Sequence, residues 1–214
     1  MLFSSIVNVT DPYSPNEVVF YPGPESNWRD LKTYGDYLYC VNETNGGLQI
    51  INLLEVISGD TNATYIENIY LGFTEAHNIY IDENGILYVF GSNYGAGGAI
   101  MFDLNSDPEN PTILGDYSLS YFHDGMVRGD TLWGAAIYNG EFSVVDVSDK
   151  ANPVLLATHS TPHAFTHNCW ISDDGSTLFT TDEVSGAFVT AYDVSDINDI
   201  EELDIIQAWS SDTD

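Results

Sequence analysis

A short phrase that recurs four times at a nearly constant interval constrains the fold of this chain more than any other feature. Each copy places a basic or imidazole side chain beside Asp or Asn and then continues into an apolar run. The first members of these pairs are Arg29, His77, His123 and His167, so the steps are 48, 46 and 44 residues. A repeat of this length indicates an array of similar structural units.

A second landmark has the same spacing. A polar residue that begins a turn follows an apolar run at Asn8, Asn52, Asp103, Asp146 and Asp193, with steps of 44, 51, 43 and 47 residues. Two landmarks with different chemistry therefore keep one register along the whole chain, which strengthens the evidence for a repeat.

Each unit contains four strand-like segments. In one unit these are residues 76–82, 86–90, 99–104 and 112–117, and the first two are separated by the turn-forming residues 83–85. Asn, Asp and Gly in such a cluster favour the positive φ angles of a tight hairpin. No segment shows helical periodicity over three turns. The pattern predicts an all-β fold, a β-propeller of four-stranded antiparallel blades, and ranks a β-sandwich below it.

The blades are expected to follow one another within a single propeller domain. Residues 1–24 supply the outer two strands of a preceding blade, and four blades follow at 25–75, 76–120, 121–163 and 164–214. We therefore expect an incomplete ring of half a blade plus four blades, whose missing strands belong to a longer chain.

The charge of the chain excludes some partners. Four Lys and Arg residues stand against 33 Asp and Glu residues, so the formal net charge is −29. Such a surface repels nucleic acid and anionic membranes and favours solubility. No run of about 20 apolar residues exists to span a membrane. Cys40 and Cys169 lie in different units, and we interpret both as buried thiols.

The repeated phrase also marks the candidate site, because the first strand of each propeller blade lines the central channel. There the phrase predicts a ring of polar side chains at one end of the channel. Imidazole nitrogen with carboxylate oxygen suits zinc, manganese or iron, whereas carboxylates with amide oxygens suit calcium. The candidate metal ligands are His77, His123, His167 and Asp124. The candidate binding residues are Arg29, Asp30, Glu43, Asn78, Asn168, Asp182 and Glu183.

A purely structural role competes with this interpretation. Every blade meets the same packing problem, so a repeated His-Asn or His-Asp pair can bond neighbouring carbonyls and cap turns without binding anything. Arg29 also argues against a ring made only of metal ligands, since a guanidinium pairs with acidic groups or anions. A direct ligand site without metal is the third possibility.

The segment from Phe142 to Val154, with its Val-Val-Asp-Val core and Asn-Pro turn, resembles the LVIVD repeat. Together with the ordered His-Asn and Asp pairs, it is similar to the choice-of-anchor B family of secreted or surface-attached bacterial propellers. That resemblance implies an extracellular or cell-surface protein, although residues 1–5 lack the features of an export signal. It implies no established activity.

Two functions follow from these observations. The favoured one is a non-catalytic binding module of the LVIVD type, whose partner is a protein, a polysaccharide or a small ligand. The alternative is a metal-dependent hydrolase or lyase, with Asp124 or Glu183 acting as the base beside a metal-activated water. The first hypothesis makes the chain more a binding protein than an enzyme.

Overall fold

The computed structural model describes residues 4–60 and 63–207, and almost every regular element in these ranges is a β-strand. A two-stranded ribbon comes first, formed by β1 (Ser4–Asn8) and β2 (Asn16–Tyr21). Four antiparallel four-stranded sheets follow, each with its strands in chain order. The prediction of an all-β propeller with four-stranded blades is confirmed.

The four sheets have similar strand lengths. The first contains β3 (Arg29–Tyr34), β4 (Tyr37–Asn42), β5 (Leu48–Asn52) and β6 (Tyr65–Asn68). The second contains β7 (Asn78–Ile81), β8 (Ile86–Phe90), β9 (Ala99–Asp103) and β10 (Thr112–Tyr117). The third contains β11 (Gly125–Arg128), β12 (Thr131–Ala136), β13 (Glu141–Asp146) and β14 (Val154–Ser160). The fourth contains β15 (Thr166–Ile171), β16 (Thr177–Asp182), β17 (Val189–Asp193) and β18 (Glu201–Ile206).

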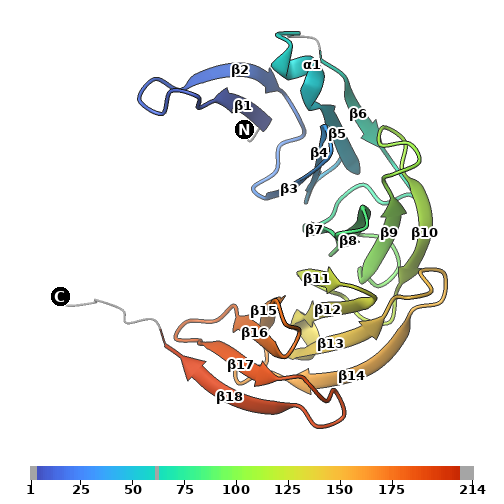
Figure 1. Cartoon of the computed structure of the whole chain (residues 1–214). Helices are drawn as coiled ribbons and strands as arrows, with labels where there is room; N and C mark the ends of the chain where they lie inside the picture. Colours follow the sequence, from blue (N-terminus) through green and yellow to red (C-terminus); the bar gives the residue numbers. More distant parts are fainter. Residues whose placement is uncertain (1–3, 61–62, 208–214) are drawn as a thin grey trace.

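The sheets fan out in an open arc, with the first strand of each on the inner side and the last on the outer side (Figure 1). Neighbouring inner strands contact one another, β3 with β7, β7 with β11, and β11 with β15. The start of each inner strand therefore lies close to the start of the next. This arrangement brings the repeated phrases together although they are more than 40 residues apart in sequence.

The ribbon of β1 and β2 shares one feature with the outer strand pairs of the sheets. Its register shifts by one residue between Ile6 and Val7. The third and fourth strands of the last three sheets carry a shift of the same kind, as in β13 and β14 between Val144 and Val145. The assignment of residues 1–24 to the outer two strands of a preceding blade stays a prediction, with which this irregularity agrees.

The apolar core lies between the sheets rather than at the centre of the arc. Tyr39 and Ile50 of the first sheet pack with Leu87 and Phe102 of the second. Similar clusters join the second sheet to the third and the third to the fourth. Each buried side chain of this size contributes about 1.5–3 kcal/mol through removal of apolar surface from water. This packing fixes the angle between sheets and hence the spacing of the inner strands.

One turn differs from the predicted pattern. After β5 the chain forms a short helix, α1 (Leu53–Ile57), where the other units have a non-helical turn. The Asn52 side chain caps it by accepting hydrogen bonds from the amides of Leu54 and Glu55. The same residue type therefore starts a helix here and a turn elsewhere, because Asn serves both purposes.

Other predictions have mixed outcomes. Cys40 and Cys169 are free and buried, as predicted. Within the described ranges, no helix has the length and apolar composition needed to cross a membrane. The unit boundaries at 25–75, 76–120, 121–163 and 164–214 stay a prediction, and the outermost parts of the first and last units, residues 1–3 and 208–214, lie outside the described residues.

Candidate metal centre

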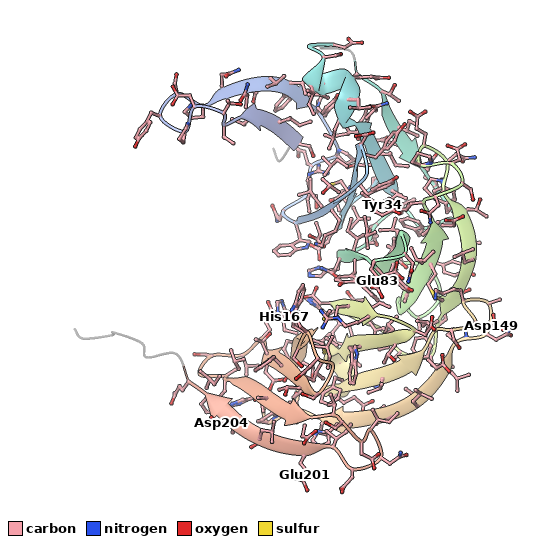
Figure 2. The ribbon with its side chains drawn as sticks, in the orientation of Figure 1. Tyr34, Glu83, Asp149, His167, Glu201 and Asp204 are labelled. Atoms are coloured by element: carbon pink, nitrogen blue, oxygen red, sulfur yellow. The ribbon has the colours of Figure 1, made fainter. Side chains whose placement is uncertain are left out.

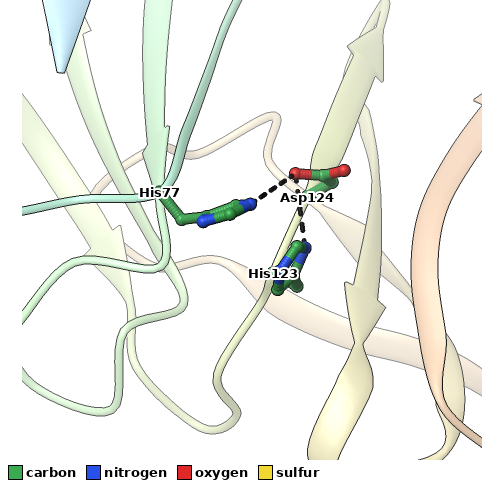
Figure 3. A group of neighbouring side chains, drawn as sticks. All are labelled: His77, His123 and Asp124. Carbon is green, nitrogen blue, oxygen red and sulfur yellow. Dashed lines mark ion pairs between the residues drawn. The ribbon is translucent and has the colours of Figure 1, made fainter. Parts of the chain in front are cut away.

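Three side chains from two adjacent inner strands converge at the inner side of the arc. His77 precedes β7, and His123 and Asp124 precede β11 (Figure 3). The Nε2 atom of His77 lies 3.8 Å from Oδ1 of Asp124, and the Nδ1 atom of His123 lies 3.5 Å from the same oxygen. The imidazole rings of the two histidines are 3.8 Å apart between centroids. One possible ligand atom from each of the three residues therefore faces the same small region, and these atoms lie within 4.8 Å of one another.

The three converging atoms share an unusual property. Nε2 of His77, Nδ1 of His123 and Oδ1 of Asp124 are all buried and have no hydrogen-bond partner among the described residues. Leaving a buried polar atom unsatisfied costs about 1–3 kcal/mol, more when the group is charged. Three such atoms facing one another are explained when a cation binds between them. Two ligands on tetrahedral zinc lie about 3.3 Å apart, close to the observed spacings.

A second carboxylate fixes the tautomer of His77. Nδ1 of His77 lies 2.7 Å from Oε1 of Glu43 and donates a hydrogen bond to it, so in the neutral ring Nε2 carries the lone pair, on the side of Asp124. The Trp28 ring stacks on His77 at 5.0 Å with an angle of 2° between the planes. The Trp28 indole also donates to the His77 carbonyl. A carboxylate behind a ligating histidine is the usual support of a metal-bound imidazole.

Asp124 is 5% exposed and is held from the neighbouring sheet. Its other oxygen, Oδ2, accepts a hydrogen bond of 2.8 Å from the Asn168 amide. Burial raises the pKa of Asp124, but the nearby His123 and Asn168 side chains lower it by more. The carboxyl is therefore ionised at neutral pH and available as an anionic ligand.

A second group of possible ligands shares His123 with the first. It combines His123, His167 and the exposed Glu183, whose ligand atoms also lie within 4.8 Å of one another. The rings of His123 and His167 are 4.6 Å apart. His167 lies on the inner side of the arc, while Asp149 and Glu201 lie at its outer edge (Figure 2). The three histidines thus form one row, and the row becomes more exposed toward His167.

Arg29 does not join this row. Its guanidinium donates to Oε1 of Gln49 at 3.2 Å and to the Pro24 carbonyl. Gln49 lies on β5 of the same sheet, and Pro24 lies in the segment between β2 and β3. Trp28, the preceding residue, is the one that contacts His77. The expectation that Arg29, His77, His123 and His167 would form a single ring is therefore wrong at its first member.

Asp30 and Asn78 join neighbouring sheets. Oδ2 of Asp30 accepts hydrogen bonds from the Asn78 amide at 2.8 Å and from the backbone of Ile79 at 2.9 Å. Lys32 pairs with the same carboxylate at 3.0 Å. These contacts occupy both oxygens, since Oδ1 also accepts from the amide of Leu31.

Asp182 supports a loop rather than the row of histidines. Its carboxylate accepts a hydrogen bond of 2.5 Å from the Thr161 hydroxyl. The backbone amides of His163 and Phe165 donate to it as well, each at 3.1 Å. Its neighbour Glu183 points its backbone amide at the Phe165 carbonyl. The pair Asp182-Glu183 is thus divided between a loop anchor and a possible ligand.

An open pocket of about 430 Å³ lies beside His77. Its lining comprises Glu43, Glu75, Ala76, Gly91, Ser92, Asn93 and Tyr121. Gly91 has φ +62°, and a Cβ there would lie 2.7 Å from the Cβ of His77 and 2.9 Å from the Tyr121 hydroxyl. A larger residue at this position would clash with His77 and with the Tyr121 hydroxyl in the pocket, and glycine avoids both clashes.

The sequence pattern did not indicate Glu75 or Tyr121 as site residues. Trp28 stood inside the first copy of the phrase, where its position directly before the Arg-Asp pair was the available signal. Glu75 precedes the second copy by two residues and Tyr121 precedes the third by the same interval. This shared offset is the signal that could have placed both at the channel end.

Comparisons with known proteins agree on the fold. No protein-family model and no curated protein matches the chain. A structure from Bacteroides uniformis, provisionally assigned as a 6-phosphogluconolactonase, matches 96% of this chain and 64% of its own, with a TM-score of 0.69 and 12% identity. The periplasmic gluconolactonase of Pseudomonas aeruginosa matches 90% and 60%, with a TM-score of 0.60 and 12% identity. Hydrazine synthase of Kuenenia stuttgartiensis matches 88% and 56%, with a TM-score of 0.58 and 16% identity.

These structures show a β-propeller fold, because their identities are too low to carry more. The chain spans less than two thirds of the length of each of the three. The resemblance to the LVIVD repeat and the choice-of-anchor B family is wrong, since no family model supports it and the similar structures include lactonase-type propellers. The segment that carried it is β13, an Asx turn at Asp146 and β14. Blade packing alone produces such an apolar strand followed by a polar turn.

The favoured function is corrected as well. The names of the neighbouring lactonases point to catalysis, so a non-catalytic binding module is wrong as the main prediction, and the metal-dependent alternative fits better. The described residues contain a His, Asp and Glu group able to hold a metal ion, which agrees with the predicted class of cofactor.

Proposed function

We propose that the chain carries the site of a metal-dependent hydrolase that opens lactones, the cyclic esters of hydroxy acids. The observation that carries this proposal is the set of three buried, unpartnered atoms of His77, His123 and Asp124. Two imidazole nitrogens and one carboxylate oxygen with a further open position are the ligands of many catalytic zinc sites. The same donors also accept manganese or iron, and they suit calcium poorly.

The reaction class comes from the similar structures, two of which are named as gluconolactonases or related lactonases. Hydrolysis of a lactone adds a water oxygen to the carbonyl carbon and breaks the bond to the ring oxygen. An ion at this site would polarise the carbonyl and lower the pKa of the attacking water. The only product is a hydroxy acid, because the leaving oxygen stays part of the same molecule. The site therefore needs no second binding pocket for a leaving group.

Residues of this chain account for the proton transfers. Glu183 is exposed and lies with His123 and His167, so its carboxylate can accept the proton of the attacking water. The protonated Glu183 then returns that proton to the ring oxygen as it leaves. Asp124 is ionised and buried, and its role is that of a ligand, because its free oxygen already faces the two histidines.

Elemental analysis combined with a lactonase assay tests this function. The purified 214-residue chain should retain about one equivalent of a transition metal after dialysis, and the ion should be lost in His77→Ala and His123→Ala. Hydrolysis of glucono-1,5-lactone, followed as acid release above the spontaneous rate, should fall with the metal. Folded chain that holds no ion at any loading would contradict the proposal.

A further inference from the structure

We infer that the pocket beside His77 binds the sugar ring of an uncharged, unphosphorylated lactone and rejects its phosphate esters. This inference rests on the proposed lactonase function and names its substrate class. The pocket holds about 430 Å³, and its lining includes Glu75 and Tyr121, which lie two residues before His77 and His123. Ala76 and Gly91 line it, and a Cβ at Gly91 would lie 2.7 Å from the Cβ of His77, so a ring seated there lies next to His77.

Polar groups of the pocket match hydroxyl groups. Across residues 4–60 and 63–207, the Glu75 carboxylate and the Tyr121 hydroxyl have no hydrogen-bond partner. The Tyr121 phenol can donate a hydrogen bond as well as accept one. A carboxylate that accepts and a phenol that donates can together hold two hydroxyls of a polyol.

An aromatic surface borders the same pocket. The rings of Tyr121 and Tyr138 are 5.0 Å apart, and Tyr138 is 75% exposed. An exposed aromatic ring beside hydrogen-bonding groups can cover the apolar face of a sugar ring. Tyr138 lies in the short helical turn Ile137–Asn139, which Gly140 ends with φ +69°.

Charge decides against a phosphorylated substrate. The lining contains two carboxylates, those of Glu43 and Glu75, and no cation. The four basic residues of the chain all have partners elsewhere, in contacts of Arg29 with Gln49, Lys32 with Asp30, Arg128 with Asp173, and Lys150 with Asp130. A phosphate dianion in this pocket would meet like charges on both sides. The product acid, which gains a carboxylate, would be repelled in the same way and released.

Paired kinetics on two substrates test the inference. Metal-loaded chain should hydrolyse glucono-1,5-lactone with a kcat/KM about 100-fold higher than that for its 6-phosphate. Glu75→Lys should narrow this ratio at least tenfold by helping the phosphate ester. Glu201→Gln, a change of an exposed carboxylate on the outermost strand, should leave the ratio unaltered. Equal or faster hydrolysis of the phosphate ester by wild type would overturn the inference while leaving the lactonase function intact.

A binding measurement covers the case in which neither lactone is hydrolysed, an outcome that counts against the proposed function alone. Calorimetric titration would use a gluconolactam, the neutral amide isostere of the lactone, and its 6-phosphate. Binding of the lactam alone, weakened at least tenfold in Tyr121→Ala and Glu75→Lys, would support the inference. Absence of lactam binding, or tighter binding of the phosphate, would overturn it.

Discussion

Two aspartates at equivalent points of the first and third repeats do the same structural work, but only one has the features of a ligand. Asp30 accepts from the Asn78 amide of the next sheet, and Asp124 accepts from the Asn168 amide of the next sheet, each at 2.8 Å. Asp30 uses its remaining capacity on Lys32 and on backbone amides. Asp124 keeps Oδ1 free among histidines.

This difference separates the structural role of the repeat from its chemistry. The hydrogen bond from an Asn to an Asp recurs between the first and second sheets and between the third and fourth sheets, where it serves the packing of the repeat. At the second interface, between the second and third sheets, His77 and His123 approach the free oxygen of Asp124, and three buried atoms are left unpaired. Structure alone explains the first interface completely and leaves the second with an energetic cost that a bound cation would remove.

The largest expected effect compares the two aspartates directly. Asp124→Asn should lower transition-metal affinity at least about 100-fold, because it removes the anionic ligand. Asp30→Asn should leave affinity unchanged, since Asp30 contacts no proposed ligand. Competition with a chromophoric chelator measures both constants, and far-ultraviolet circular dichroism checks folding. Equal loss of affinity in the two variants would remove the distinction between the interfaces.

Loss of the Glu43 carboxylate, which supports His77, should have the next largest effect on metal affinity. Glu43→Gln weakens the hold on Nδ1 and should lower metal affinity about 10–100-fold, the usual range for a group behind a ligating histidine. Glu141→Gln is the matched control on β13, where the carboxylate accepts a hydrogen bond from the Asn139 side chain and from no other side chain among the described residues. The same chelator titration applies. An unchanged affinity in Glu43→Gln would show that this carboxylate does not orient His77.

At the first interface, between the first and second sheets, we expect a substitution to change the free energy of unfolding rather than metal affinity. Asp30→Ala leaves the Asn78 amide and the Ile79 backbone amide without their acceptor, and it should destabilise the chain by about 2–4 kcal/mol. Urea unfolding followed by fluorescence measures this change. Added zinc should stabilise wild type and Asp30→Ala by similar amounts, because the ion binds only at the second interface. A zinc effect that disappears with Asp30 would contradict that separation.

The smallest effect concerns an aspartate in an exposed turn. Hydrogen bonds from Ser172 and Ser176 lower the pKa of Asp174 to about 2 from an ordinary value of 3.8. A lowered pKa means that this stabilisation is present above about pH 4 and is lost as pH falls toward 2. Asp174→Asn should therefore flatten the acid limb of a stability profile between these values. An unaltered slope would show that the turn contributes nothing there.

Much of the fold was predictable because blades repeat. The spacing from His77 to His123 to His167 follows from the length of one blade, and the packing between sheets then places these residues in one row. The prediction that Arg29 would join the histidines failed, because nothing in the sequence shows to which side its side chain points. Similarly, the pattern could not show that the Asp182 carboxylate would accept hydrogen bonds from the loop that begins at Thr161, since these contacts depend on how the connecting segment folds back.

X-ray absorption spectroscopy on the zinc-loaded chain tests the site most directly. The expected spectrum has two imidazole nitrogens at about 2.0–2.1 Å with one or more oxygen neighbours, from His77, His123 and Asp124. In Asp124→Asn this spectrum should not form at equal zinc concentration. A wild-type spectrum with oxygen ligands alone, or one identical in the variant, would show that the three unpaired atoms do not hold the ion.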